Sequence, residues 1–207
     1  HLLITYFAYG SNMNSDVLER RVGAKSSIPQ QRCILRDWGL VFNVPQKAPG
    51  PAFASVEKIP QSGILDNSKI GLDNQSIPPF VEGCIYDLTL PQFMLLLASE
   101  GIGVAYKLQR VRVESESRSP STSTRKVLAY TFVNSITNGR AILQMDEQKQ
   151  QEMGVEVEEV KRLGYSKMMR SIPRPPSRRY KELLSKGGRA LDLSPEYQHF
   201  LDNVVSL

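Results

Sequence analysis

Seven consecutive residues near the start of the sequence, Tyr6-Phe7-Ala8-Tyr9-Gly10-Ser11-Asn12, are typical of a binding turn. The apolar run that ends at Tyr9 predicts a buried strand, and Gly10 ends it where the backbone needs freedom that a Cβ would deny. Polar residues 11–16 then offer N-caps for a helix over 17–21. Free backbone N–H groups and the helix dipole would favour an anion there, such as a carboxylate. The alternative is an ordinary strand-to-helix turn.

Glu100 is the side chain best placed for acid/base chemistry. It follows an almost wholly apolar segment, residues 91–99, which begins with proline and is predicted to be a helix. A carboxylate at the negative end of a helix and beside apolar side chains should have a raised pKa, which suits a general acid/base. The alternative is a solvent-facing residue at a helix end.

The elements that must position these residues are mostly strands with a few short helices. Gly83 lies within one predicted strand and indicates a bulge or a close backbone approach. Two segments rich in Pro, Gly, Asn and Ser, 60–79 and 115–125, are predicted to be flexible surface loops. Alternation of apolar and polar residues predicts strands at 30–35, 38–44, 52–59, 80–88, 106–114 and 126–134. Helices are predicted at 17–21, 91–99, 178–184 with an end at Gly187-Gly188, and 194–205; 145–153 is compatible with another.

Length and composition favour one domain that spans 1–207. The chain has 207 residues, 41% of them hydrophobic, without an internal repeat or a composition shift strong enough to divide it. No apolar run reaches the roughly 18 residues that a membrane helix needs, and no signal-peptide pattern opens the chain. The chain begins directly on the first strand, so any targeting peptide is expected to have been removed or never to have existed.

Charge and cysteine content limit which metals, cofactors and binding partners are expected. With two His and with Cys33 and Cys84 as the only cysteines, neither a disulfide framework nor a protein-only metal site is expected, and no cofactor is indicated. The net charge of +5 permits anionic partners without requiring them. No nucleic-acid motif accompanies the basic C-terminal region, which we interpret mainly as a solvated face. Its cations are Arg170, Arg174, Arg178, Arg179, Lys181, Lys186 and Arg189.

Four segments, in this order, resemble the γ-glutamylcyclotransferase family, also called AIG2-like. They are YFAYGSN at 6–12, EGCIYDL at 82–88, Ser99-Glu100-Gly101 followed by Tyr106, and PSRRYKELLSKGGRALDLSPEYQHFL at 176–201. The resemblance covers roughly residues 4–59, 80–134 and 175–203. It implies an α+β fold, a small mixed β-barrel with surrounding helices, whose cavity binds a γ-glutamyl group.

The resemblance also implies a metal-independent mechanism of the acyltransferase or lyase type. The substrate's α-carboxylate would sit on the backbone N–H groups around Tyr9, Gly10, Ser11 and Asn12. Tyr6, Phe7 and Ala8 complete the expected substrate-binding segment. Glu100 would take a proton from the α-ammonium, the freed amine would attack the γ-carbonyl, and 5-oxoproline would leave with an amino acid or amine. Tyr106 and Tyr180 match family tyrosines that line the cavity, although packed barrel tyrosines are an equal alternative. The sequence departs from the family at Leu97, where an Asp is often found.

Two hypotheses remain open at this stage. The first is a cyclotransferase that acts on γ-glutamyl amino acids, peptides or amines. The second is a non-catalytic relative that binds a small carboxylate, or docks into a larger assembly through its loops and basic C-terminal region. Nucleic-acid binding is a distant third. The expected compartment is the cytoplasm, or a plastid if a transit peptide was removed.

Overall fold

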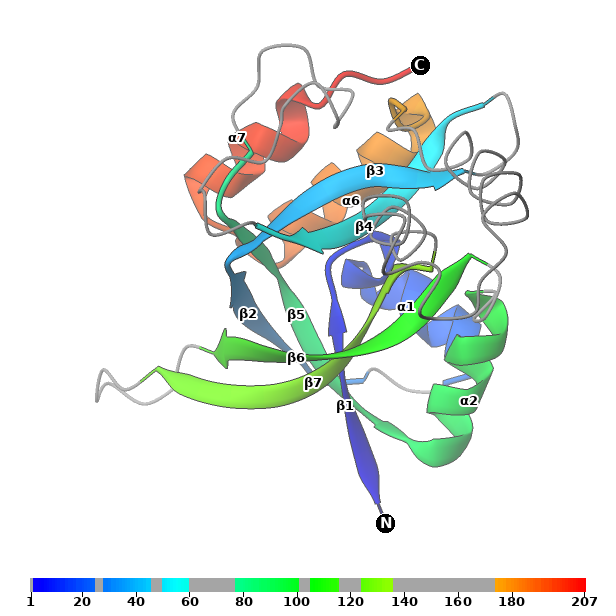
Figure 1. Ribbon diagram of the computed structural model, residues 1–207. Helices are drawn as coiled ribbons and strands as arrows, with labels where there is room; N and C mark the ends of the chain where they lie inside the picture. Colours follow the sequence, from blue (N-terminus) through cyan, green and yellow to red (C-terminus); the bar gives the residue numbers. More distant parts are fainter. Residues whose placement is uncertain are drawn as a thin grey trace, which may run out of the picture.

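Five strands close into a barrel in the order β1-β5-β2-β6-β7 (Figure 1). Neighbouring strands pair antiparallel except where β7 closes the barrel on β1, in a parallel pairing that matches Tyr6 with Tyr130. The barrel is therefore mixed, and the predicted α+β fold with surrounding helices is confirmed. The strands are β1 (Leu3–Ala8), β2 (Gln30–Arg36), β5 (Phe80–Thr89), β6 (Tyr106–Ser115) and β7 (Arg125–Asn134).

The computed structural model describes residues 2–24, 28–45, 50–59, 77–100, 105–115, 124–135 and 174–207. The predicted helix at 145–153 lies outside these residues, as do most of the predicted loops at 60–79 and 115–125. None of the helices in the described ranges is long and apolar enough to cross a membrane.

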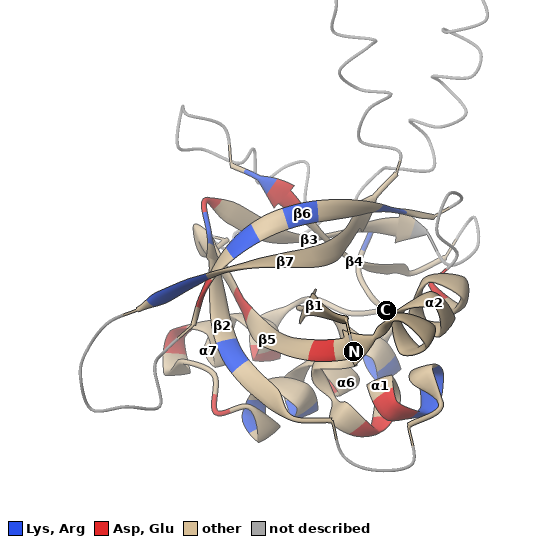
Figure 2. Ribbon diagram, turned by 90° about the horizontal axis from the view of Figure 1, so that it is seen from below, with Lys and Arg blue, Asp and Glu red and all other residues tan. Residues whose placement is uncertain are grey.

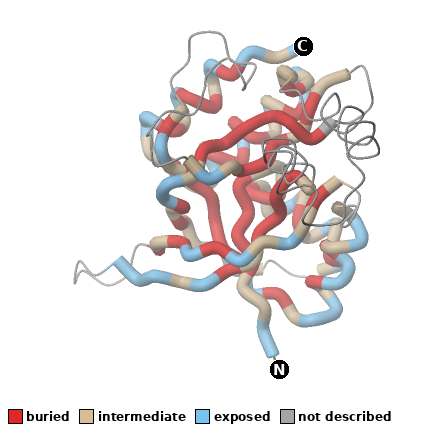
Figure 3. The backbone as a smooth tube through the Cα atoms, in the orientation of Figure 1, coloured by how far each residue is buried: buried red, intermediate tan, exposed pale blue. Residues whose placement is uncertain are grey.

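The end of β1 is buried on both faces: successive side chains of a strand point in opposite directions, and residues 6–8 are all buried. On β1, Phe7 packs into one hydrophobic cluster and Ala8 into the other, and both are fully buried. On β7, Ala129 and Phe132 divide between the same two clusters. Figure 3 shows the resulting buried backbone at the centre of the molecule. The end of β1 is therefore held firmly where the binding turn begins.

A two-stranded antiparallel sheet, β3 (Trp38–Pro45) and β4 (Ala52–Lys58), packs beside the barrel. Its first strand follows β2 after a turn at Asp37, whose φ of 61° lies in the left-handed region. The segment before α6 is tied to both strands: Arg174 N donates to Phe42 O at 3.0 Å, and Ala52 N donates to Pro175 O at 3.2 Å. These bonds fix the start of the C-terminal helices against the sheet.

Two helices of the candidate site each follow a barrel strand, the first after β1 and the second after β5. After η1 (Ser11–Met13), α1 (Ser15–Val22) begins at Asn14, whose side chain accepts a hydrogen bond from Asp16 N at 3.0 Å. The second helix, α2 (Leu90–Ser99), begins at Thr89 with Pro91 in its first turn and packs against α1. Of the predicted N-cap candidates Asn14 is the cap, the predicted proline in the first turn of α2 is confirmed, and the packing brings the end of α2 to the binding turn.

The C-terminal helices are α6 (Arg178–Ala190) and α7 (Pro195–Asn203). The predicted end of α6 at Gly187-Gly188 is wrong, because both glycines lie inside the helix. A Cβ on Gly187 would come within 3.3 Å of Met13 Cβ, and one on Gly188 within 2.6 Å of Gln198 Oε1. The glycines therefore serve close packing against η1 and α7 rather than helix termination.

Gly83 on β5 confirms the predicted close approach of two backbones. A Cβ there would lie 2.1 Å from Ala8 O, which real Cβ atoms do not reach. We predict that Gly83→Ala lowers the free energy of unfolding by at least about 3 kcal/mol, because the backbone of β1 cannot move without opening the barrel. Urea denaturation followed by circular dichroism measures this loss.

Gly23→Ala is the matched control for that experiment. Gly23 has a φ of +64°, but its Cβ would meet only Leu95 Cδ1, at 3.8 Å. Its substitution should cost about 1 kcal/mol through backbone strain alone. Equal losses for the two variants would contradict the proposed steric role of Gly83.

Asp202 joins α7 to α6 through a polar cluster. Gln198 Nε2 and Arg189 Nη2 each donate to its carboxylate at 2.9 Å, and Ser185 Oγ also donates. Partial burial acts to raise the pKa of Asp202, but these hydrogen bonds and the guanidinium charge outweigh burial, so the pKa lies below its ordinary value.

A lowered pKa means that ionised Asp202 stabilises the fold above its unfolded pKa of about 4, and that this contribution is lost as the pH falls through the folded value. We predict that Asp202→Asn lowers Tm by about 2–4 °C at pH 7. The gap between wild type and variant should narrow below pH 4, as measured by thermal denaturation across pH. A gap that stays constant would contradict this role. The exposed Glu182→Gln provides the control.

Candidate active site

A cavity of about 290 Å³ opens where the binding turn, the end of α2, the start of β6 and the start of α6 meet. We call it the outer lobe. A smaller hollow of about 30 Å³, the inner lobe, shares Ser11, Glu100, Tyr106 and Tyr180 with it. The outer lobe is also lined by Arg21, Val44, Phe53, Ser99 and Ala105, and the inner lobe by Tyr6, Tyr9, Gly10, Asn12, Ala54 and Phe132.

Glu100 lies between the two lobes, at the C-cap of α2. Its side chain is 14% exposed. Its Oε1 accepts a hydrogen bond from Asn12 Nδ2 at 2.8 Å and forms an ion pair with Arg21 Nη1. Asn12 and Arg21, which lie far from Glu100 in the chain, thus both bind Oε1. Neither of these two bonds is made to Oε2.

The surroundings of Glu100 are more polar than the sequence predicted. The expected apolar walls are replaced on one side by Asn12 and the Arg21 guanidinium. A neighbouring cation favours the ionised carboxylate, which opposes the expected effect of an apolar environment. Leu97, at the position of the family Asp, instead packs against a hydrophobic cluster. The polar neighbours that hold Glu100 in this chain are therefore Asn12 and Arg21.

Arg21 is a site residue that sequence reasoning missed. It lies in the last turn of α1, in a run of polar residues that gave no reason to separate it from Arg20. Only the packing of α1 against α2 brings its guanidinium to Glu100. No local signal in the sequence identifies that contact. Phe53 and Val44 were missed for the same reason, because they come from the separate two-stranded sheet.

Tyrosine hydroxyls form much of the polar wall. Tyr106 Oη donates to Ala54 O at 3.0 Å, and the N–H of Ala54 donates to Tyr180 Oη at 3.4 Å. Tyr9 Oη donates to Phe132 O, and Tyr6 Oη accepts from Asn12 Nδ2 at 2.9 Å. Tyr6 and Tyr180 accept in these bonds, so none of the bonds uses their own hydroxyl hydrogens.

Burial keeps these hydroxyls protonated. It raises the pKa of Tyr180 to about 12, even though hydrogen bonds from the backbone of Ala54 and Ser11 act to lower it. Burial likewise raises the pKa of Tyr6, Tyr9 and Tyr106 well above the ordinary value for tyrosine. At neutral pH all four therefore act as neutral hydrogen-bond donors.

The binding turn is present, and Gly10 also permits a close approach of another residue. Its φ of −107° and ψ of −148° lie outside the helical and extended regions. A Cβ would lie 3.1 Å from the hydroxyl oxygen of Tyr180. Gly10 lets that hydroxyl approach the turn, where it also receives a hydrogen bond from the backbone of Ser11.

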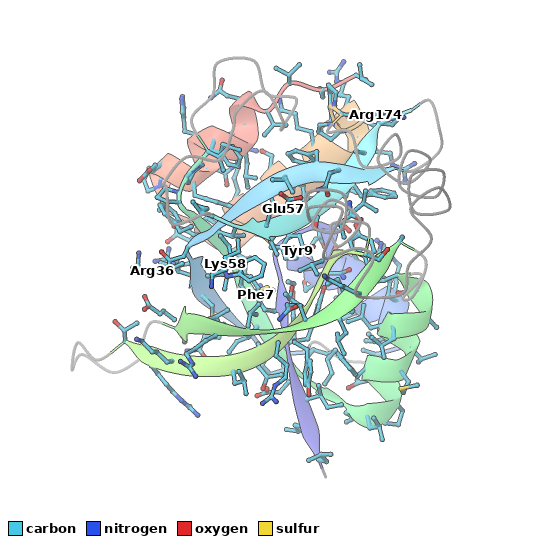
Figure 4. All side chains as sticks on the ribbon, in the orientation of Figure 1. Phe7, Tyr9, Arg36, Glu57, Lys58 and Arg174 are labelled. Carbon is cyan, nitrogen blue, oxygen red and sulfur yellow. The ribbon has the colours of Figure 1, made fainter. Side chains whose placement is uncertain are left out.

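Phe7 and Ala8 are the two predicted substrate-binding residues that the structure does not bring to either lobe. Both side chains are fully buried in the hydrophobic clusters. Figure 4 shows Phe7 and Tyr9 in the interior, far from Arg174 at the edge of the molecule. The other predicted site residues all line a lobe: Tyr6, Tyr9, Gly10, Ser11, Asn12, Glu100, Tyr106 and Tyr180.

The described residues contain no group of three or more His, Cys, Asp or Glu side chains that could hold a metal ion. The described residues that line the two lobes offer one carboxylate, one guanidinium, neutral tyrosine hydroxyls and backbone N–H groups. These groups can bind a small zwitterion, accept a proton and stabilise a developing oxyanion.

Comparisons with known proteins agree with this description. No protein-family model matches the chain. The chain is 26% identical over 202 residues to the gamma-glutamyl cyclotransferase aclK of Aspergillus oryzae, a match that covers 94% of this chain and 59% of that protein. The chain thus spans about three fifths of the length of this curated relative.

Solved structures show the same architecture. A gamma-glutamyl cyclotransferase aligns with a TM-score of 0.64 at 15% identity, covering 100% of this chain and 90% of its own. An uncharacterized protein from Homo sapiens aligns with a TM-score of 0.63 at 16% identity over the same shares. A gamma-glutamyl cyclotransferase from yeast, specific to glutathione, aligns at 0.55 and 14% identity, covering 99% and 96%.

The barrel and its cavity therefore define a protein with the γ-glutamylcyclotransferase-like fold. The resemblance that the sequence motifs indicated is confirmed, since the curated relative carries the same family name.

The buried tyrosines give a spectroscopic test of this site. Six of the eight tyrosines have a pKa raised by burial: Tyr6, Tyr9, Tyr86, Tyr106, Tyr180 and Tyr197. We predict that these six stay protonated at pH 10.5 and ionise only as the protein unfolds. Absorbance at 295 nm during alkaline titration counts the tyrosinates, and circular dichroism reports the fold. Reversible ionisation of more than two tyrosines in the folded protein would contradict the described burial.

Proposed function

We propose that this chain is a γ-glutamylcyclotransferase, which converts a γ-glutamyl compound into 5-oxoproline and a free amino acid or amine. The observation that carries the proposal is the position of Glu100, a largely buried carboxylate at the junction of two lobes walled by neutral hydroxyls. The shared fold and the name of the curated relative support the same activity.

The γ-glutamyl end of the substrate would bind at the binding turn. The backbone N–H groups of the turn and the neutral hydroxyl of Tyr6 offer donors for its α-carboxylate. The inner lobe, at about 30 Å³, has room for one small polar group. Asn12 Oδ1 is buried and accepts no hydrogen bond from the described residues, so a substrate ammonium would supply its missing donor.

Glu100 would act as the acid and base. Its carboxylate takes a proton from the α-ammonium, and the freed amine attacks the γ-carbonyl carbon to form the lactam C–N bond. As the bond to the leaving nitrogen breaks, Glu100 gives that proton to the leaving nitrogen. The new ring nitrogen then loses a second proton, which Glu100 also passes to the departing amine. Of the three ammonium protons, one stays on the lactam nitrogen and two end on the departing amine, so the step balances without an oxidant or a co-reactant.

The cavity would accelerate this step mainly by holding the substrate bent. The nucleophile and the carbonyl belong to the same molecule, and a cavity of about 290 Å³ is at the small end for ligand sites, which suits a folded dipeptide-sized substrate. The Tyr180 hydroxyl would stabilise the oxyanion that forms at the γ-carbonyl. No step of this mechanism requires a metal, in keeping with the predicted metal-independent class.

A non-catalytic role is the second candidate. Figure 2 shows basic and acidic segments distributed over the surface, on the barrel as well as on the helices. In this non-catalytic role the cavity would bind a small carboxylate without converting it. The buried carboxylate of Glu100 favours the catalytic proposal, because a site that only binds a carboxylate gains nothing from a second negative charge.

The two cysteines indicate the redox conditions of the compartment in which we expect the protein to work. Cys33 and Cys84 are both free and buried. Reduced thiols support a reducing compartment such as the cytoplasm, with a plastid as the alternative.

Mass-spectrometric detection of 5-oxoproline tests the proposal. Wild type should release 5-oxoproline from members of a panel of γ-glutamyl amino acids, γ-glutamyl amines and glutathione. Glu100→Gln should lower kcat by at least about 100-fold, since general acid/base catalysis contributes roughly 10²–10⁴-fold. Glu196→Gln, at an exposed acid on α7, is the matched control and should keep full activity.

The outcomes separate the two candidates. A folded wild type that turns over no member of the panel favours the non-catalytic role, and calorimetry with the same panel then reports whether the cavity still binds. Activity that survives in Glu100→Gln would sink the acid/base assignment while leaving the cyclotransferase class in place.

A further inference from the structure

Arg21 introduces a positive charge into the candidate active site. Among the described residues that line the two lobes, only Arg21 and Glu100 carry charged side chains. Arg21 lines the outer lobe and is absent from the described lining of the inner lobe. Its side chain is 31% exposed, against 14% for Glu100, so Arg21 is the more exposed of the two residues.

The ion pair between Arg21 and Glu100 conflicts with substrate binding as proposed above. A substrate ammonium that reaches Glu100 would place two cations at one carboxylate in a partly buried cavity, where like charges repel strongly. The conflict disappears if Arg21 can exchange Glu100 for another anion. The α-carboxylate of the glutamyl group is already accounted for by the binding turn, so the second anion must come from the other half of the substrate.

We infer that Arg21 is a specificity-determining residue, which binds the carboxylate of the amino acid that departs from the γ-glutamyl group. The inference rests on the proposed function and narrows its substrate class to γ-glutamyl amino acids and peptides in which the residue next to the scissile bond carries a nearby carboxylate. The outer lobe supplies the location, because the leaving group extends from Glu100 away from the inner lobe. Arginine suits carboxylate binding, since its planar guanidinium can donate two parallel hydrogen bonds to the two carboxylate oxygens.

The same exchange disfavours γ-glutamyl amines. A leaving group without a carboxylate gives Arg21 no anion other than Glu100, so the guanidinium competes with the substrate ammonium for the catalytic carboxylate. When a substrate carboxylate draws Arg21 away, Glu100 also loses the cation that favours its ionised form and becomes a stronger base. Recognition of the leaving group and activation of Glu100 are thus one event.

A pair of substrates that differ by one carboxylate tests the inference. γ-Glutamylalanine and γ-glutamylethylamine have leaving groups with the same N–C–C skeleton, and only the first also carries a carboxylate. We expect wild type to show a kcat/KM about 10- to 100-fold higher for γ-glutamylalanine, the range for one charge-assisted contact. In Arg21→Gln this ratio should fall close to one, and Arg21→Lys, which keeps the charge without the planar guanidinium, should give an intermediate ratio.

The ratio distinguishes a specificity role from a structural one. Loss of the Glu100 contact alone would lower turnover of both substrates equally and leave the ratio unchanged, which would overturn the inference. Arg20→Gln is the matched control, because Arg20 is exposed on the same helical turn and lies outside the described lining of both lobes. It should keep the wild-type ratio. A wild-type ratio near one would also overturn the inference.

Failure of the proposed function gives a different result. If folded wild type releases no 5-oxoproline from either compound, the cyclotransferase proposal fails, and calorimetry with the same two compounds replaces kinetics. Tighter binding of γ-glutamylalanine that is lost in Arg21→Gln would still support carboxylate recognition by Arg21. Equal binding of the two compounds would overturn it.

Discussion

Closure of the barrel through β1 is the constraint on which the rest of the structure depends. This strand of six residues pairs with β5 on one side and β7 on the other, and it is buried on both faces at its C-terminal half. Gly83 allows β5 to lie against the backbone of Ala8 without a side chain between them. Because β1 cannot shift, the turn that follows it is presented at a fixed place, where the ends of α2 and β6 and the start of α6 also arrive.

That fixed turn is what makes a buried carboxylate tolerable at the end of an apolar helix. A charge removed from water must be compensated by hydrogen bonds or by an opposite charge. Asn12 and Arg21 provide both for Glu100, and they come from segments about 80 residues earlier in the chain. The compensation is one-sided, since both contacts are made to the same oxygen. Such an arrangement stabilises the charge while leaving the other oxygen for chemistry.

Two of the tyrosines around this carboxylate, Tyr106 and Tyr180, are positioned by a single residue of β4. Ala54 accepts from Tyr106 through its carbonyl and donates to Tyr180 through its N–H. Phe53 packs edge-on against Tyr180, with ring centroids 5.0 Å apart. The two-stranded sheet thus sets the hydroxyl positions, and burial keeps them neutral. A wall of neutral donors beside one carboxylate and one guanidinium discriminates by charge, which is the property on which the inference about Arg21 depends.

The sequence by itself determined the elements and the motifs. The strands, the Asn14 and Pro91 signals, the close approach at Gly83 and the turn before Asn12 could all be predicted, because local periodicity and backbone chemistry determine them. Glu100 could be proposed because it follows an apolar helix and because Ser99-Glu100-Gly101 resembles a motif of the γ-glutamylcyclotransferase family. Only the tertiary structure placed Phe7 and Ala8 in the core and showed that Gly187 and Gly188 serve packing. Only the tertiary structure brought Arg21 to Glu100, since that contact depends on how two helices cross, and no pattern within either helix specifies a crossing.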